Sequence, residues 1–89
     1  MNIKVRNMQS PRGNDIPNQF VIETPKGTYF QSYDSVIVFI NKDGKVFLDE
    51  VYWDCSKTTG KYRNLFLRED KKETENKIKD GVYKLVNLN

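Results

Sequence analysis

The chain has 89 residues with a formal net charge of +3, a single cysteine and no histidine. This length predicts one domain, residues 1–89, with little core to spare for a deep internal pocket. A lone cysteine excludes an internal disulfide, and no apolar run is long enough for a membrane helix or a secretory signal. We therefore expect a soluble, cytoplasmic protein with no membrane partner.

The N-terminal third predicts a strand, a loop and a hairpin. Residues 3–6 alternate apolar and basic side chains, which is typical of a short two-faced strand. Residues 9–18 (QSPRGNDIPN) hold two Pro, one Gly and two Asn, and this composition predicts a loop. Residues 19–33 then predict a hairpin closed around Pro25-Lys26-Gly27.

The central part predicts two further strands. Residues 36–40 (VIVFI) are continuously apolar, as expected for a central strand covered on both faces. Residues 41–44 contain the Asp-Gly pair typical of a tight turn, and the alternation over residues 45–52 predicts the return strand. Residues 19–52 are therefore interpreted as an antiparallel meander.

The C-terminal part predicts two short helices and a last strand. Tyr62 and Phe66 lie one helical turn apart, which favours a helix at about 58–68, with Ser56, Thr58 or Thr59 as its N-cap. A second helix at about 71–80 has clearer boundaries, with Asp70 as N-cap, Glu73 completing a capping box, and Gly81 after its C-terminus.

Residues 82–88 (VYKLVNL) predict a terminal strand that joins the sheet. The expected class is α+β, with an antiparallel sheet of about four to six strands and two helices. Since aliphatic residues are few, we expect the Phe, Tyr and Trp rings to supply much of the core.

Several familiar chemistries are excluded by composition and spacing. Without histidine, the usual zinc sets and the Ser-His-Asp and Cys-His mechanisms are missing. Gly60-Lys61 does not complete a phosphate-binding loop, because Cys55 stands where a glycine is needed and Tyr62 where a hydroxyl residue is needed. We predict no catalytic residue, no metal, no cofactor and no enzymatic activity.

Two residues near the first helix have structural interpretations. Asp54 is expected either to cap this helix or to hold Arg63 in a fixed position. Cys55 is expected to be a small packing residue, because no histidine is present to activate its thiol.

The segment from Tyr52 to Leu67 (YWDCSKTTGKYRNLFL) combines rings, hydroxyls and positive charge. No acidic residue lies between Asp54 and Glu69. The segment either faces a partner or is a strand-to-helix corner whose rings pack inward. The loop residue Arg12, between Pro11 and Gly13, is a second exposed candidate. The predicted partner-binding residues are Arg12, Trp53, Lys57, Lys61, Tyr62 and Arg63.

Four words of the sequence resemble a family of short bacteriophage proteins that form a domain of unknown function. They are SPRGN (10–14), PNQF (17–20), YFQSYDSVI (29–37) and YWDCSKTTGKYRNLFL (52–67). The resemblance implies a phage origin and a role in the cytoplasm of an infected bacterium. The family more often has an aromatic residue where Cys55 stands, and the resemblance supplies no activity, cofactor or site residue.

The function expected from this reasoning is that of a non-enzymatic binding protein. Short phage accessory proteins often modulate or inhibit a host or phage complex, in host takeover or against host defence. In that case we expect Arg63→Ala to weaken the complex without unfolding the protein. The alternative is a small nucleic-acid-binding protein that uses its aromatic and basic residues. A third possibility is self-assembly through an exposed edge strand.

Overall fold

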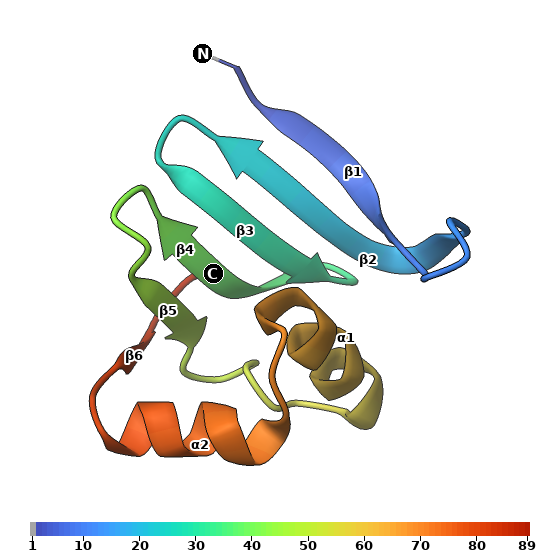
Figure 1. Ribbon diagram of the computed structural model, residues 1–89. Coiled ribbons are helices and arrows are strands. Elements are labelled where there is room, and N and C mark those ends of the chain that lie inside the picture. The colour runs from blue at the N-terminus through green and yellow to red at the C-terminus, as the bar shows by residue number, and fades with distance from the viewer. Residues whose placement is uncertain (1) are drawn as a thin grey trace.

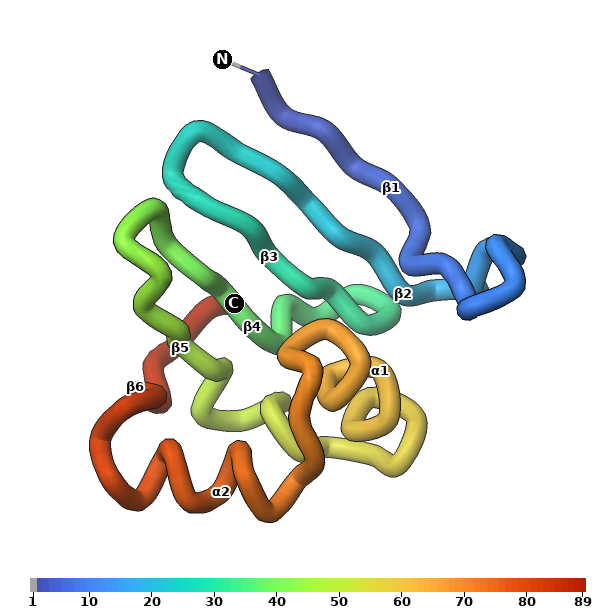
Figure 2. Tube along the Cα trace, in the orientation of Figure 1, coloured from blue at the N-terminus to red at the C-terminus, as the bar shows by residue number. Residues whose placement is uncertain are grey.

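The computed structural model describes residues 2–89, in which one six-stranded sheet is accompanied by two helices (Figure 1). The strands lie side by side in the order of the chain, as the tube in Figure 2 traces. In chain order the elements are β1 (Lys4–Gln9), β2 (Asp15–Thr24), β3 (Gly27–Ser32), β4 (Ser35–Asn41), β5 (Val46–Asp49), α1 (Lys57–Leu67), α2 (Lys71–Lys79) and β6 (Tyr83–Val86).

The first five strands form an antiparallel meander, and β6 pairs with β5 in parallel. A parallel pair needs a long crossover, and here the crossover contains both helices. The predicted α+β class and both helices are confirmed. The sheet is mixed rather than purely antiparallel, because the chain passes through α1 and α2 before it returns beside β5.

The turn between β1 and β2 is shorter than the predicted loop. Gln9 belongs to β1 and residues 15–18 belong to β2, so only residues 10–14 form the connection. The N–H of Ser10 donates to Asn14 O at 2.8 Å, and Gly13 adopts a φ of +83°. This backbone closure lets pairing begin where the composition predicted a loop.

The return strand β5 ends at Asp49 instead of continuing to residue 52. The Asp49 carboxylate, which is 1% exposed, accepts hydrogen bonds from the N–H groups of Val51, Tyr52 and Leu88 at 2.8–3.0 Å. Such a side chain offers the following backbone an alternative to the strand ladder. It also ties the end of β5 to the C-terminal segment.

Aromatic rings contribute to both faces of the sheet. On the face covered by α1, Phe30, Val38 and Leu48 are register partners and are fully buried. Phe66 of α1 stacks on Phe30 with ring centroids 5.5 Å apart. This contact between α1 and the sheet fixes which side of the helix faces solvent.

A second row of rings lies on the opposite face of the sheet. Tyr29 stacks on Phe39 with centroids 4.4 Å apart, and Phe39 lies 6.1 Å from Phe47. These three residues are register partners across β3, β4 and β5. The rings therefore contact one another across strands, as cross-strand pairs in a sheet do.

Candidate binding site around the first helix

The start of α1 is defined by a hydroxyl cap. Ser56 has an extended backbone, and its Oγ accepts a hydrogen bond from the N–H of Thr59 at 3.1 Å. Of the three predicted candidates, Ser56 is therefore the N-cap. The first turn of α1 contains no acidic residue, so the partial positive charge of this helix end has no carboxylate within the turn.

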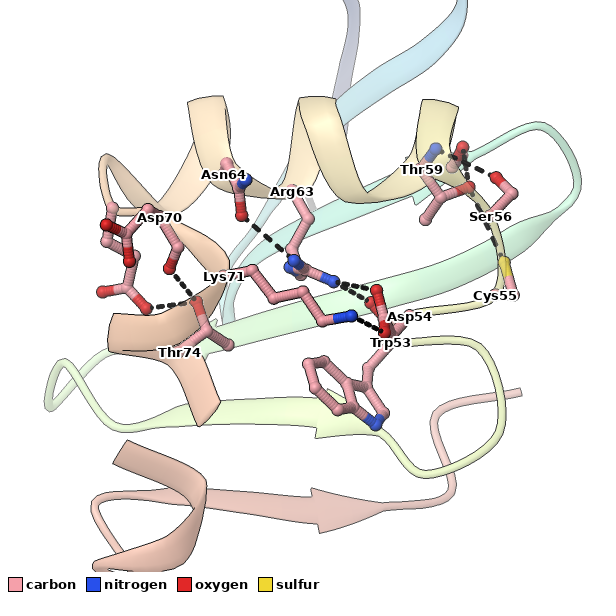
Figure 3. A network of polar contacts seen from close by, with 12 residues as sticks. Trp53, Asp54, Cys55, Ser56, Thr59, Arg63, Asn64, Asp70, Lys71 and Thr74 are labelled. Atoms are coloured by element: carbon pink, nitrogen blue, oxygen red, sulfur yellow. Dashed lines mark hydrogen bonds and ion pairs between the residues drawn. The ribbon is translucent and has the colours of Figure 1, made fainter. Parts of the chain in front are cut away.

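Arg63 lies inside the protein and connects α1 to the segment before it. Its Nη1 donates to Trp53 O at 2.6 Å and to Asp54 Oδ1 at 3.2 Å, and its Nη2 donates to Asn64 Oδ1 at 3.0 Å. The side chain extends from α1 toward Asp54, as Figure 3 shows. The guanidinium also lies over the Trp53 ring, with Cζ 5.1 Å from the ring centroid.

This position of Arg63 differs from the surface position expected from the sequence. The residue is 0% exposed, so its guanidinium is committed to groups of its own chain. A buried cation that binds a carboxylate and a backbone carbonyl is hard to remove without destabilising the fold. The expectation that Arg63→Ala leaves the fold intact therefore conflicts with the geometry.

Asp54 joins Arg63 to the second helix. Its Oδ2 accepts from Lys71 Nζ at 2.7 Å, while its Oδ1 pairs with Arg63 (Figure 3). Burial acts to raise the pKa of Asp54, but hydrogen bonds and charge from Lys71 and Arg63 outweigh it and hold this pKa below its ordinary value. Of its two predicted roles, Asp54 has the second, since it holds Arg63.

A small polar cluster connects the start of α1 to the sheet. The hydroxyls of Ser32 in β3 and Thr59 in α1 share a hydrogen bond of 3.0 Å between buried residues. The Cys55 thiol donates to Thr59 Oγ1 at 3.6 Å, but Cys55 is exposed and is not the packing residue predicted. This cluster fixes the N-terminal half of α1 against β3.

The two rings predicted as partner contacts are partly buried. Trp53 and Tyr62 both pack against the hydrophobic core. Each also lies near a cation, because Lys61 Nζ is 5.3 Å from the Tyr62 ring centroid and Arg63 covers Trp53. Part of each ring surface therefore contributes to the fold, and only the remainder faces solvent.

Two hollows flank the solvent side of α1 and share Lys61 and Asn64. The apolar hollow has a volume of about 450 Å³ and is lined by Ser10, Pro11, Ile16, Lys61, Tyr62, Asn64 and Leu65. The basic hollow has a volume of about 560 Å³ and is lined by Asp54, Ser56, Lys57, Gly60, Lys61, Arg63, Asn64 and Lys71. They form one continuous surface along α1.

The six predicted partner-binding residues have different environments. Lys57 and Lys61 are exposed and border the basic hollow. Arg12 is exposed in the β1–β2 turn, and its neighbour Pro11 lines the apolar hollow. Ser10 and Pro11 of this turn line the apolar hollow together with residues of α1, whereas Arg12 itself lines neither hollow. Leu65, which is 46% exposed, was missed because a lone leucine at helical spacing predicts core.

The buried carboxylate of Glu69 was also missed by sequence reasoning. Glu69, between the helices, accepts from Lys77 Nζ at 2.7 Å, Tyr83 Oη at 2.7 Å and Thr74 Oγ1 at 2.6 Å. Burial acts to raise the pKa of Glu69, but these three partners outweigh it and lower the pKa. The three donors follow Glu69 by five to fourteen residues, a spacing that no local pattern announces.

The model of a family of unknown function, DUF8033, matches residues 3–81 of this chain. The protein belongs to this family. Comparison with curated proteins gives no match, and comparison with solved structures gives none. The matched residues 3–81 include the β1–β2 turn, α1 and every residue that lines the two hollows, which together are called the α1 surface below.

Two further observations concern the described residues 2–89. No helix in this range is long and apolar enough to cross a membrane. Nor does this range contain a group of three or more His, Cys, Asp or Glu residues placed to hold a metal ion.

Proposed function

We propose that this member of DUF8033 is a non-enzymatic, phage-encoded binding protein. It acts in the cytoplasm of an infected bacterium, where it modulates or inhibits a host or phage macromolecular complex. The phage origin is supported by the resemblance of four sequence words to short phage proteins. The binding role is supported by one structural observation, the α1 surface with its two adjoining hollows.

The α1 surface combines apolar area with positive charge in a small space. Pro11, Tyr62 and Leu65 supply apolar walls, and Lys61 lies at the boundary between the two hollows. Interfaces commonly place apolar and aromatic groups at their centre and leave charged groups at the rim. We infer that the apolar hollow receives a side chain of the protein partner while Lys57 and Lys61 contact its acidic or polar rim.

The structure also changes which residues we assign to binding. Lys57, Lys61 and Tyr62 remain in the proposed surface, and Leu65 is added to it. Arg12 lines neither hollow and stays a candidate only through its neighbour Pro11. Arg63 supports this surface from beneath by fixing α1, so it is assigned a positioning role. Trp53 is partly buried and lines neither hollow, so it is assigned at most a secondary contact.

Affinity capture with a matched variant pair tests this proposal. Tagged protein is used to recover partners from a lysate of the phage-infected host. Leu65→Glu places a charge in the apolar hollow and is expected to abolish recovery of the specific partner. Val82→Glu changes another exposed aliphatic residue, 61% exposed and distant in the chain, and is expected to leave recovery unchanged. Equal recovery by both variants, or no partner with the unmodified protein, contradicts the proposal.

The alternative function is direct nucleic-acid binding, and it is favoured by the gathering of Lys57, Lys61 and Lys71 at one hollow. Cations that neutralise phosphates release counterions, so affinity then falls steeply as salt is added. An electrophoretic mobility assay at low salt tests this alternative. No retardation of single-stranded or double-stranded DNA or RNA at low salt removes it.

A further inference from the structure

The basic hollow has an unequal balance of charge. Four cationic side chains line it, from Lys57, Lys61, Arg63 and Lys71, against the single carboxylate of Asp54. It lies between the N-terminal half of α1 and the first turn of α2, and its volume of about 560 Å³ is within the usual range of small-ligand sites.

The one carboxylate in the hollow is already paired on both oxygens. Asp54 Oδ1 accepts from Arg63 at 3.2 Å, and Oδ2 accepts from Lys71 at 2.7 Å. Within residues 2–89, neither Lys57 nor Lys61 pairs with a carboxylate. Asp54 therefore does not neutralise these two ammonium groups directly, and they remain free to meet an anion.

Arg63, one of the residues that line the hollow, carries an unsatisfied donor. Arg63 is fully buried, and its Nε, unlike its two terminal nitrogens, has no hydrogen-bond partner among the described residues. A buried donor without an acceptor is rare in folded proteins and calls for a physical explanation. Nε is not reached from solvent, but an anionic oxygen bound in the hollow faces the positive charge of this guanidinium.

The backbone of α1 adds to the same preference. Lys57 begins the helix, and the first turn itself lacks an acidic residue. The Asp54 carboxylate lies beside Gly60 in this turn but is already paired with Arg63 and Lys71, so it offsets the positive end of the helix dipole only in part. Lys57, Lys61 and Asn64 follow one another at spacings of four and three residues, which places them on one side of α1. Phosphate groups are commonly bound where a helix N-terminus and nearby cations act together.

We propose that the basic hollow binds a phosphate group, with Lys57 and Lys61 as its direct ligands and Arg63 as the fixed charge beneath. A phosphate dianion carries more charge than a carboxylate and has three acceptor oxygens, which suits several separate ammonium donors. This inference rests on the proposed function, because it assigns a ligand chemistry to part of the same surface. The phosphate belongs either to a small free ligand, as such a dianion, or to a nucleic-acid backbone, whose diester groups each carry one negative charge and two free oxygens.

Nuclear magnetic resonance titration of the full chain with inorganic phosphate tests the site directly. Sodium chloride at matched ionic strength serves as the reference. We expect phosphate to shift the backbone amides of residues 57–61 in a saturable manner beyond the effect of chloride. If these amides respond equally to both salts, the phosphate site does not exist.

A charge-matched pair of double variants locates the ligands. Lys57→Gln with Lys61→Gln is expected to weaken phosphate binding by on the order of tenfold or more, because two charge-assisted hydrogen bonds are lost. Lys42→Gln with Lys45→Gln removes the same charge from two exposed lysines at the β4–β5 turn and is expected to leave affinity unchanged. Equal weakening by the two pairs would show a general effect of net charge and overturn the assignment.

A short single-stranded oligonucleotide as competitor separates the two sources of phosphate. If it displaces inorganic phosphate and binds more tightly, the hollow receives a nucleic-acid backbone. If it does not compete while inorganic phosphate binds, the ligand is a small phosphate compound.

The failures of the two proposals are distinguishable. Partner capture that depends on Leu65, without any phosphate response, overturns the phosphate site and leaves the proposed function standing. A phosphate response that depends on Lys57 and Lys61, without any captured partner, supports the phosphate site and overturns the proposed function.

Discussion

Arg63 and the two lysines of α1 belong to one cationic segment, yet their surroundings are opposite. Arg63 is 0% exposed and binds Trp53 O and Asp54, whereas Lys57 and Lys61 are exposed and pair with no carboxylate of residues 2–89. The guanidinium suits burial because its planar fork satisfies several acceptors at once, while an ammonium group holds its water strongly. Within one helix, therefore, one cation is committed to the fold, and two are exposed without a carboxylate partner among residues 2–89.

Arg63→Ala is expected to have the largest effect on stability. It removes the link between α1, Trp53 O and Asp54 and leaves a cavity beside the Trp53 ring. We expect the free energy of unfolding to fall by about 3 kcal/mol, since breaking a buried ion pair typically costs about 3–5 kcal/mol and Asp54 here keeps Lys71. Urea denaturation measures it.

The control for Arg63→Ala is Arg6→Ala on the edge strand β1. Arg6 is exposed, and its 3.9 Å contact with Glu23 is of the kind that contributes little. We expect a change within about 0.5 kcal/mol for this exposed substitution. If the two substitutions cost the same, the contrast between buried and exposed cations is wrong.

Glu69→Gln tests whether the buried carboxylate beside α2 stabilises the fold as Arg63 does beside α1. The substitution keeps the shape but replaces one acceptor oxygen by a donor that opposes Thr74, Lys77 or Tyr83. We expect a loss of about 2 kcal/mol in the free energy of unfolding, as for other buried groups left without a partner. Glu75→Gln, at an exposed position of α2, is the matched control and should be nearly neutral.

The parts of the fold that follow local rules were predictable from the sequence. Asp70 and Glu73 form the predicted capping box, and Gly81 adopts a φ of +77° after α2. These signals depend only on residues within one turn of each other, so neighbours in the chain suffice to find them. The same holds for the meander, where short turns make adjacent strands pair.

The parts that depend on distant contacts were not predictable in the same way. Arg63 is buried because a backbone carbonyl ten residues earlier accepts its hydrogen bond, and no spacing pattern announces such a contact. Glu69 is buried by donors from α2 and β6, which meet it only after the parallel crossover forms. The sequence thus indicated the cationic segment of α1 as a candidate, while the division between its buried and exposed cations required the tertiary structure.

Acid is expected to lower the free energy of unfolding through three carboxylates, those of Asp49, Asp54 and Glu69. Burial acts to raise the pKa of Asp49, Asp54 and Glu69, but their hydrogen bonds and paired charges outweigh it and lower the pKa of all three. A lowered folded-state pKa means that the unfolded chain binds more protons in acid. Stability is then fully present above the unfolded value near ~4 and is lost as pH falls through the folded values.

The measurement is the free energy of unfolding by urea between pH 7 and pH 3. We expect little change from pH 7 to pH 5 and a decline below about pH 4. Asp49→Asn should make this decline shallower, since it removes one of the three groups. A free energy that rises on acidification would contradict the sign of all three shifts.

The smallest effect on stability is expected where the largest effect on binding is proposed. Lys57→Gln removes a cation from the first turn of α1, which slightly relieves its repulsion by the helix dipole. Lys61→Gln removes the contact of Lys61 Nζ with the Tyr62 ring, 5.3 Å from its centroid, which costs a similar amount. The two contributions oppose each other, so the free energy of unfolding should change by less than about 0.5 kcal/mol. Thermal denaturation followed by circular dichroism measures this change. A loss as large as that of Arg63→Ala would mean that the lysines also hold the fold together, and their value as free ligands for an anion would be lost with it.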